Sequence, residues 1–303
     1  MQNLDPEGLI ARGSITNRRL GERRQFYSKG PNWLINVDQH DKLMGFRKQE
    51  YPLGIHAAID SFSRRVLWLK VTPSNSNPNH VARWMLEYLE EFHLIPIRTR
   101  SDPGNENSLL SQMQRFLRRN HRDGLAGEKA HITGSSTTNQ PIERWWRDYR
   151  ERSGQYFRDE VKGLKNDGLY NPSNNAERAC LALVYIPVIQ GELNKFRNWW
   201  NSHRIRLQVG TDRPSGIPDL LFKFPEAYGA QQCGLPTVPE ELRYLQGKAF
   251  AQPVRDFVPA WFRQESEDLF TEHGMQLDHS TARAAYILLK RNFGTRDDLA
   301  VIL

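Results

Sequence analysis

Apolar side chains near the start of the chain gather in three short runs, at residues 33–38, 53–60 and 65–71. The last two runs are rich in β-branched and aromatic residues, and runs of this length predict β-strands. We expect Asp60 to close a turn between them rather than to bind a metal. Residues 79–92 instead carry their apolar side chains at helical spacing, which predicts a helix with one buried face.

The same pattern continues with shorter elements. It predicts a strand at 97–102, a helix at 105–119, a short strand at 130–133 and a helix from residue 141. Parallel strands need crossover connections, and the helix at 79–92 supplies one. We expect the loop at 120–129 to be mobile or to face a substrate.

Beyond residue 165 the pattern is helical throughout. Prolines and glycines predict breaks in it at Pro172, Pro187, Gly210, Pro214 and Pro218. Its longest apolar stretch, 179–189, is about half of the roughly 20 residues that a membrane-spanning helix needs. We interpret that stretch as a buried core helix and expect no membrane association.

The distribution of charge along the chain indicates which class of partner the protein binds. The chain has a formal net charge of +7, and its last 73 residues hold 8 Lys/Arg against 10 Asp/Glu, so the basic excess lies in residues 1–230. Such an excess suits a polyanionic partner, although a basic protein without such a partner stays open.

The two cysteines and the N-terminus indicate the compartment. Cys180 and Cys233 cannot form a disulfide framework and lack zinc-ligand spacing. The N-terminal residues have no apolar segment of the kind found in secretory signals. We expect an intracellular, unsecreted protein in a reducing compartment.

Three carboxylates stand at the ends of predicted elements. Asp38 and Asp102 each close a strand, and Glu143 opens an Arg/Trp-rich helix, with 40 residues between the last two acids. Isolated acids are mostly surface or capping residues, but acids from three elements also suit Mg²⁺, which prefers hard oxygen ligands. Two such ions can activate one oxygen and stabilise another during phosphodiester chemistry.

The flanking residues support strand-end and helix-start positions for these acids. Asp102 is followed by Pro103 and Gly104, a turn that lets the backbone leave the strand sharply. Before Glu143, we expect Thr138 or Asn139 to cap the helix, with a proline in its first turn.

One face of that helix combines acid and base. Glu143, Arg147 and Arg150 follow one another at helical steps of four and three, so they share a side. They can pair with one another, or the arginines can bind DNA. Trp145 and Trp146 can stack on bases, but we expect them to pack in the core.

Taken together, the three acids and their spacing resemble the catalytic core of retroviral-type integrases and DDE transposases. A narrower resemblance, over about residues 5–230, is to eukaryotic integrase core domain proteins related to transposable elements. The strings that carry it are Lys29-Gly-Pro-Asn32, Asp38 followed by Asp41-Lys-Leu43, residues 59–69, 114–119 and 126–129, and Trp200-Asn-Ser-His-Arg-Ile-Arg206. Two positions depart from that family, which usually has His and Gly where this chain has Asn36 and Gln39.

The resemblance implies an α/β fold, a ribonuclease H-like integrase core with a mostly helical C-terminal extension. We expect a basic N-terminal arm at 1–30, the catalytic core at 31–165, a helical extension of the core at 166–230 and an acidic helical tail at 231–303. We also expect residues 1–230 to fold without that tail.

The resemblance also implies metal-dependent DNA cleavage and strand transfer in the nucleus. Asp38, Asp102 and Glu143 would be catalytic and would hold two Mg²⁺ or Mn²⁺ ions. The residues expected to contact DNA are Arg144, Arg147, Arg150, Asn139 and Gln140. Two alternatives are a domesticated DNA-binding or chromatin-associated protein with weak or absent catalysis, and a simple metal-dependent nuclease. Homo-oligomerisation is left open.

Overall fold

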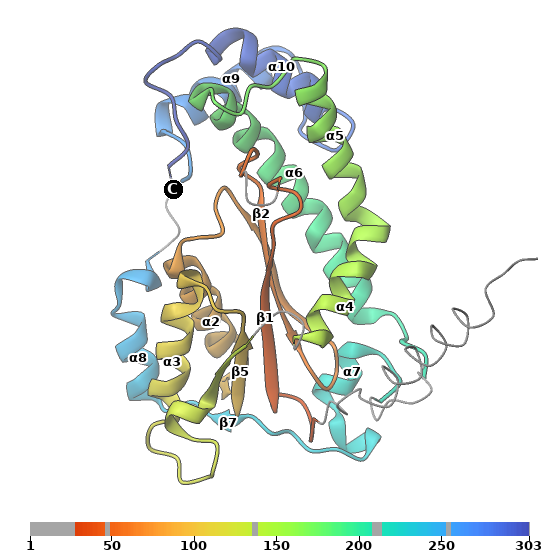
Figure 1. Ribbon diagram of the computed structural model, residues 1–303, viewed down its shortest axis with the longest axis vertical. Helices are drawn as coiled ribbons and strands as arrows, with labels where there is room; N and C mark the ends of the chain where they lie inside the picture. Colours follow the sequence, from red (N-terminus) through yellow and green to blue (C-terminus); the bar gives the residue numbers. More distant parts are fainter. Residues whose placement is uncertain (1–27, 46–48, 135–138, 208–213, 253–255, 303) are drawn as a thin grey trace, which may run out of the picture.

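A five-stranded sheet in the order β3-β2-β1-β5-β6 runs through the centre of the molecule (Figure 1). The computed structural model describes residues 28–45, 49–134, 139–207, 214–252 and 256–302. The strands are β1 Leu34–His40, β2 Gly54–Asp60, β3 Val66–Thr72, β5 Arg98–Ser101 and β6 His131–Thr133.

The pairing of the strands confirms the predicted fold class. β1, β2 and β3 form an antiparallel meander, whereas β5 and β6 join β1 in parallel. This mixed sheet with flanking helices is the ribonuclease H-like arrangement, followed by a helical C-terminal region. The boundaries expected at residues 30, 165 and 230 stay predictions, and most of the expected basic arm falls outside the described residues.

Helices cover both faces of the sheet (Figure 1). Their bounds are α2 Pro78–Phe92, α3 Ser108–Arg118, α4 Gln140–Tyr149, α5 Gln155–Asn166, α6 Asn175–Ser202, α7 Pro218–Lys223, α8 Pro239–Gln246, α9 Ala260–Glu272 and α10 Ala282–Phe293. Helices α2, α3 and α8 lie on one side of the sheet and α4 and α6 on the other. Within the described residues, no helix is long and apolar enough to span a membrane.

Alternation along the strands creates two apolar cores. On β1, Ile35 and Val37 pack toward α2 and α3, while Asn36, between them, faces the start of α4. On β2, Ile55 and Ala57 belong to the other core, with α4, α6 and α10. The packing of these two cores determines which face of β1 meets α4.

The free edge of β3 is covered by side-chain amides of α6. Gln190 accepts a hydrogen bond from Val71 N at 3.0 Å and donates to Leu69 O at 3.0 Å. Asn201 does the same at Val66, accepting from N at 2.8 Å and donating to O at 3.0 Å. Each amide therefore replaces one partner residue of a missing neighbouring strand.

Helix α6 runs through a break that the sequence predicted. Pro187 lies inside the helix, so the prediction of a break there is wrong. Proline removes one helical hydrogen bond, but both flanks of this segment are buried, including Ile186 and Val188, and packing holds the helix together.

The C-terminal region is less separate than expected. Strand β4 Leu94–Ile95 pairs with β7 Leu235–Pro236, so the region after residue 165 is not purely helical. Phe262 and Tyr286 are buried in the same core as α6, while Leu245 is buried beside α2. Residues 231–303 thus contribute to both cores.

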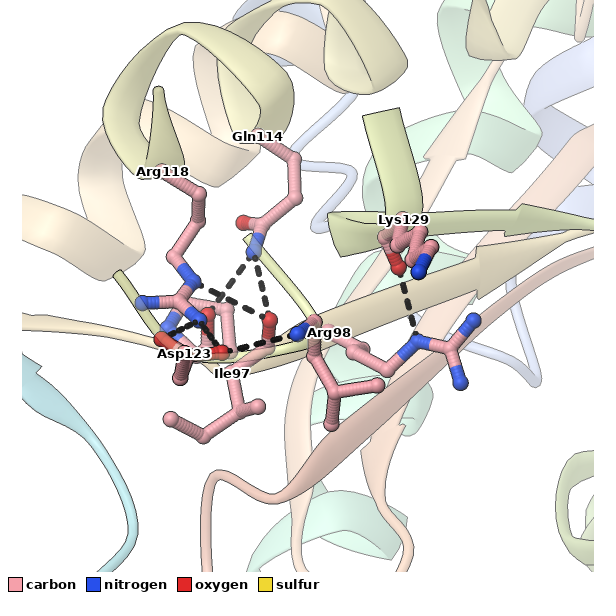
Figure 2. A network of polar contacts seen from close by, with 8 residues as sticks. Ile97, Arg98, Gln114, Arg118, Asp123 and Lys129 are labelled. Atoms are coloured by element: carbon pink, nitrogen blue, oxygen red, sulfur yellow. Dashed lines mark hydrogen bonds and ion pairs between the residues drawn. The ribbon is translucent and has the colours of Figure 1, made fainter. Parts of the chain in front are cut away.

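Hydrogen bonds anchor the loop after α3, and the expectation that it is mobile or faces a substrate stays a prediction. Figure 2 shows the fully buried Arg118 reaching back to β5 and the loop. Its guanidinium donates to both carboxylate oxygens of Asp123, at 2.6 and 2.7 Å, and to Ile97 O at 3.3 Å. Further along, Arg98 donates to Lys129 O at 2.9 Å. Hydrogen bonds at both ends therefore tie the loop to the sheet.

Candidate active site

Asp38 lies on β1, and Asp102 lies directly after the neighbouring parallel strand β5. Leu34 pairs with Arg98 and Asn36 with Arg100. Continued by two residues, this register sets Asp102, directly after β5, beside Asp38. Asp102 is half-buried, and its Oδ1 is buried without a hydrogen-bond partner in the described structure.

Asp38 points from β1 toward α4, where only 7% of it is exposed. Its Oδ2 accepts a hydrogen bond from the Trp146 indole N–H at 2.8 Å. Burial raises the pKa of Asp38 to about 8, against the opposing effect of that hydrogen bond. The charges of Asp102 and Glu143 raise the pKa further, so the three acids lie within electrostatic reach of one another.

Glu143 occupies the first turn of α4 and is exposed. Partial burial raises its pKa, the charge of Asp102 raises it further, and Lys42 opposes both. Burial also raises the pKa of Asp102, against the influence of Arg100. Every acid of the trio is therefore held in a site that disfavours its negative charge.

These conditions fit a hard divalent cation, which would neutralise the acids and give the unpartnered Asp102 Oδ1 a partner. In the part of the chain that the structure describes, no three His, Cys, Asp or Glu side chains are already gathered as a metal-binding set. The assignment of Asp38, Asp102 and Glu143 as metal ligands stays a prediction.

Asn139 fixes the start of α4 to β1. It occupies the N-cap position, as one of the two expected residues, but its side chain makes no capping hydrogen bond, and it is fully buried. Its Oδ1 accepts from Asn36 Nδ2 at 2.6 Å, and its Nδ2 donates to Val37 O at 3.2 Å. A buried amide with these partners has no surface for DNA, so we replace its expected DNA contact with a structural role. Thr138 and the side chain of Gln140 lie outside the described part of the chain.

Residues 26–216 match the family model of the integrase core domain. The chain belongs to the integrase core domain family. This family comprises polynucleotidyl transferases of the transposon and retroviral type, and its domains bind DNA. No curated protein sequence matches the chain.

The two positions at which this integrase core domain departs from the usual residues of its family both take part in hydrogen bonds. Asn36 binds Asn139, as described above. Gln39 donates to Glu106 Oε1 at 3.1 Å, and Asn107 donates to the same oxygen at 2.9 Å. These contacts join the end of β1 to the turn that carries Asp102.

Glu106 is a buried acid near the trio that the sequence did not reveal. Burial raises its pKa, and the charges of Asp41 and Asp102 raise it further. In sequence, it resembled an ordinary acid at the start of a helix. In the structure it lies close to Gly104, where an added Cβ would come within 2.1 Å of the Glu106 carboxylate.

Basic side chains of the integrase core domain lie beside the acids. Burial lowers the pKa of His40 to about 3, and the charges of Lys42, Arg150 and Arg158 lower it further. Arg144 and Arg147 are exposed on α4, and Arg150 is half-buried directly after it. Their predicted DNA contacts are untested, but their positions are open to a large anionic ligand.

Two further expectations are confirmed. Asp60 is fully buried and accepts hydrogen bonds from Asn32 N, Ser63 N and Ser63 Oγ at 2.7–2.8 Å, which makes it a turn residue. Trp145 and Trp146 are both buried, and they pack in the core as expected.

Proposed function

We propose that this integrase core domain is a metal-dependent DNA strand transferase of the DDE type, with Asp38, Asp102 and Glu143 as its metal ligands. The observation that carries the proposal is that Asp38 on β1, Asp102 directly after the neighbouring parallel strand β5, and Glu143 on α4 lie within electrostatic reach of one another. Like charges in one partly buried place destabilise a fold, so their presence favours a functional role.

Two Mg²⁺ or Mn²⁺ ions, when bound, would activate the attacking oxygen and stabilise the leaving oxygen. The protein's own part is to hold the acids and to bind the substrate backbone. We assign contacts with the DNA phosphates to Arg144, Arg147 and Arg150; such contacts fix position without reading sequence. In the proposed reaction a 3′ hydroxyl, or water, attacks a phosphodiester in line, and one phosphorus–oxygen bond forms as another breaks. We propose the nucleus as the site of this activity, because DNA is its proposed substrate.

The test is a nicking and strand-transfer assay on labelled DNA duplexes with Mg²⁺ or Mn²⁺. We expect wild-type protein to cut or join the duplex and each of Asp38→Asn, Asp102→Asn and Glu143→Gln to lose that activity. Asp159→Asn removes an exposed acid from α5 and should leave the rate unchanged. Cleavage that survives all three amide substitutions would contradict the proposal.

A second candidate is a DNA-binding or chromatin-associated protein with weak or absent catalysis. It is favoured by the two departures at Asn36 and Gln39, whose side chains are committed to Asn139 and Glu106. Wild-type protein that binds duplex DNA but never cuts or joins it with either metal would support this candidate.

A further inference from the structure

The contact between Trp146 and Asp38 joins a helix to a central strand at the candidate site. The indole N–H of Trp146 donates to Asp38 Oδ2 at 2.8 Å, and both residues are buried. A neutral donor thus occupies one oxygen of the carboxylate. The indole N–H has no other orientation available without turning the whole ring.

That ring is held on several sides. It stacks on His40 with ring centroids 4.8 Å apart and an interplanar angle of 22°. Trp145 contacts it at 4.8 Å and Tyr149 at 6.0 Å. His40 and Asp38 are alternate residues of β1 and share a face. Trp146 therefore contacts two side chains that are neighbours on that face of the strand.

Helix α4 contacts β1 at a second point. Asn139 binds the side chain of Asn36 and the carbonyl of Val37. Glu143 lies four residues after Asn139 and three before Trp146, so all three occupy one face of the helix. Hydrogen bonds on either side of Glu143 therefore fix its position along β1.

We propose that Trp146 is a positioning residue that orients the carboxylate of Asp38 for metal and, together with Asn139, sets the place of Glu143 relative to it. This inference rests on the proposed function. Hydrogen bonds to metal-binding side chains orient them, and loss of one such bond typically costs 10- to 100-fold in metal affinity or activity.

The chain offers a matched control on the same helix. Trp145 is equally buried, but its indole nitrogen has no hydrogen-bond partner in the described structure. Trp146→Phe and Trp145→Phe each remove one indole N–H and keep a buried aromatic ring. Only the first of them removes a contact with Asp38.

The experiment titrates metal-free protein with Mn²⁺ in the absence of DNA and follows free Mn²⁺ by electron paramagnetic resonance. Asp38→Asn, which should abolish the binding, identifies the site. We expect Trp146→Phe to weaken Mn²⁺ binding by about 10- to 100-fold and Trp145→Phe to change it less than about threefold. Thermal unfolding of both variants reports any loss of stability separately.

Fluorescence reports where the metal binds. Mn²⁺ bound at Asp38 should quench the adjacent Trp146, so the quenching should persist in Trp145→Phe and be lost in Asp38→Asn, while a merely structural change in either tryptophan variant would appear in thermal unfolding and not in Mn²⁺ affinity. If Trp146→Phe does not fold, replacing Trp146 with 3-benzothienylalanine removes the N–H with little change of shape. The same loss of Mn²⁺ affinity is then expected.

Two outcomes contradict different statements. Wild-type protein that binds no Mn²⁺ at Asp38 overturns the proposed function, and the positioning role with it. Wild-type binding that Trp146→Phe and Trp145→Phe weaken equally, or that the benzothienyl variant leaves unchanged, overturns the positioning role alone.

Discussion

At the scale of single residues, two buried aspartates differ in what surrounds their charge. Asp60 has three hydrogen-bond donors from its own turn and from Asn32. Asp38 has the Trp146 indole and the backbone N–H of Gln39, together with two acids that repel it. Burial raises the pKa of both aspartates, but the hydrogen bonds to Asp60 offset part of that cost, whereas the two neighbouring acids add to it at Asp38.

Replacing Asp38 with Asn should therefore stabilise the metal-free protein at alkaline pH. The folded-state pKa of Asp38 is raised from 3.8 to about 8, so the folded chain keeps a proton that the unfolded chain releases. The contribution of protonated Asp38 to the free energy of unfolding is therefore complete below pH 3.8 and is lost as the pH rises from there through about 8. At about 1.4 kcal/mol per unit of pKa shift, the gain for Asp38→Asn at pH 8 should be a few kcal/mol, measurable by urea unfolding with a chelator present.

Asp60→Asn is the control for this prediction. An amide offers a single acceptor oxygen where three donors now bind, and unmet buried donors cost about 1–3 kcal/mol. We expect this variant to be less stable than wild type at pH 8. A lower stability of Asp38→Asn at that pH would contradict the prediction.

His56 should make the protein sensitive to acid. It is buried, accepts a hydrogen bond from the Trp68 indole at 3.0 Å, and burial lowers its pKa from 6.5 to about 3. The unfolded chain therefore binds a proton that the folded chain does not, and stability falls as the pH drops from 6.5 toward 3. Between pH 7 and 5 the loss from this one histidine is about 2 kcal/mol. His56→Gln should shrink the fall in unfolding free energy by that amount, and an unchanged fall would rule out His56 as its source.

At the scale of elements, the sequence predicted what local pattern determines. The period-two run at β1 and the apolar stripe of α2 lie within a few residues of their expected bounds. Pro187 misled because packing around α6 outweighs one lost hydrogen bond. The pairing of β4 with β7 joins two-residue strands far apart in sequence, which are too short to show a period.

In the candidate site, too, features set by local sequence could be predicted, whereas features set by the packing of distant segments could not. Asp38 and Asp102 could be found because each follows an apolar run that predicts a strand, although β1 continues past Asp38 to His40. The hydrogen bonds from Trp146 to Asp38 and from Gln39 to Glu106 could not, since each depends on how two distant segments pack.

The amides on α6 lead to a prediction about the edge of β3. Asn201→Ala leaves the backbone N–H and C=O of Val66 without the partners that Asn201 now provides, which should cost about 1–3 kcal/mol. An exposed strand edge also promotes pairing between molecules, so the variant should aggregate sooner on heating. Asn198→Ala, an exposed site on the same helix, should change neither unfolding free energy nor light scattering. Equal behaviour of the two variants would mean that the edge is protected by other groups.

At the scale of the whole molecule, the last quarter of the chain, residues 231–303, closes both cores. Phe262, Tyr286 and Leu289 are fully buried with α6, and Cys233 N donates to Pro31 O at the other end of the sheet. The expectation that residues 1–230 fold alone took the acidic composition of the tail as a sign of separation. Composition describes the surface of these helices and not the faces that they bury.

We now expect truncation after residue 230 to unfold the protein. Each fully buried large side chain that is removed costs about 2–5 kcal/mol of stability. The loss from several of them together exceeds the roughly 5–15 kcal/mol that stabilises a typical domain. The measurement is the near-ultraviolet circular dichroism and thermal transition of the truncated chain. A cooperative transition near that of the full chain would restore the view of a separate tail.

The distribution of charge over the whole molecule gives a final prediction, for DNA binding. If Arg147 and Arg150 contact phosphates, replacing both with Glu should weaken binding to all duplex sequences about equally, because phosphates carry no base identity. Each lost contact should reduce the slope of log affinity against log salt by about 0.9 in magnitude. A matched pair, Arg243→Glu with Arg291→Glu, changes the net charge equally at exposed positions on α8 and α10. If binding depended only on total charge, both pairs of substitutions would lower the affinity for DNA. If Arg147 and Arg150 make specific phosphate contacts, only the first pair changes the slope. If the slopes are the same, the two arginines act through α4 and its packing rather than on DNA.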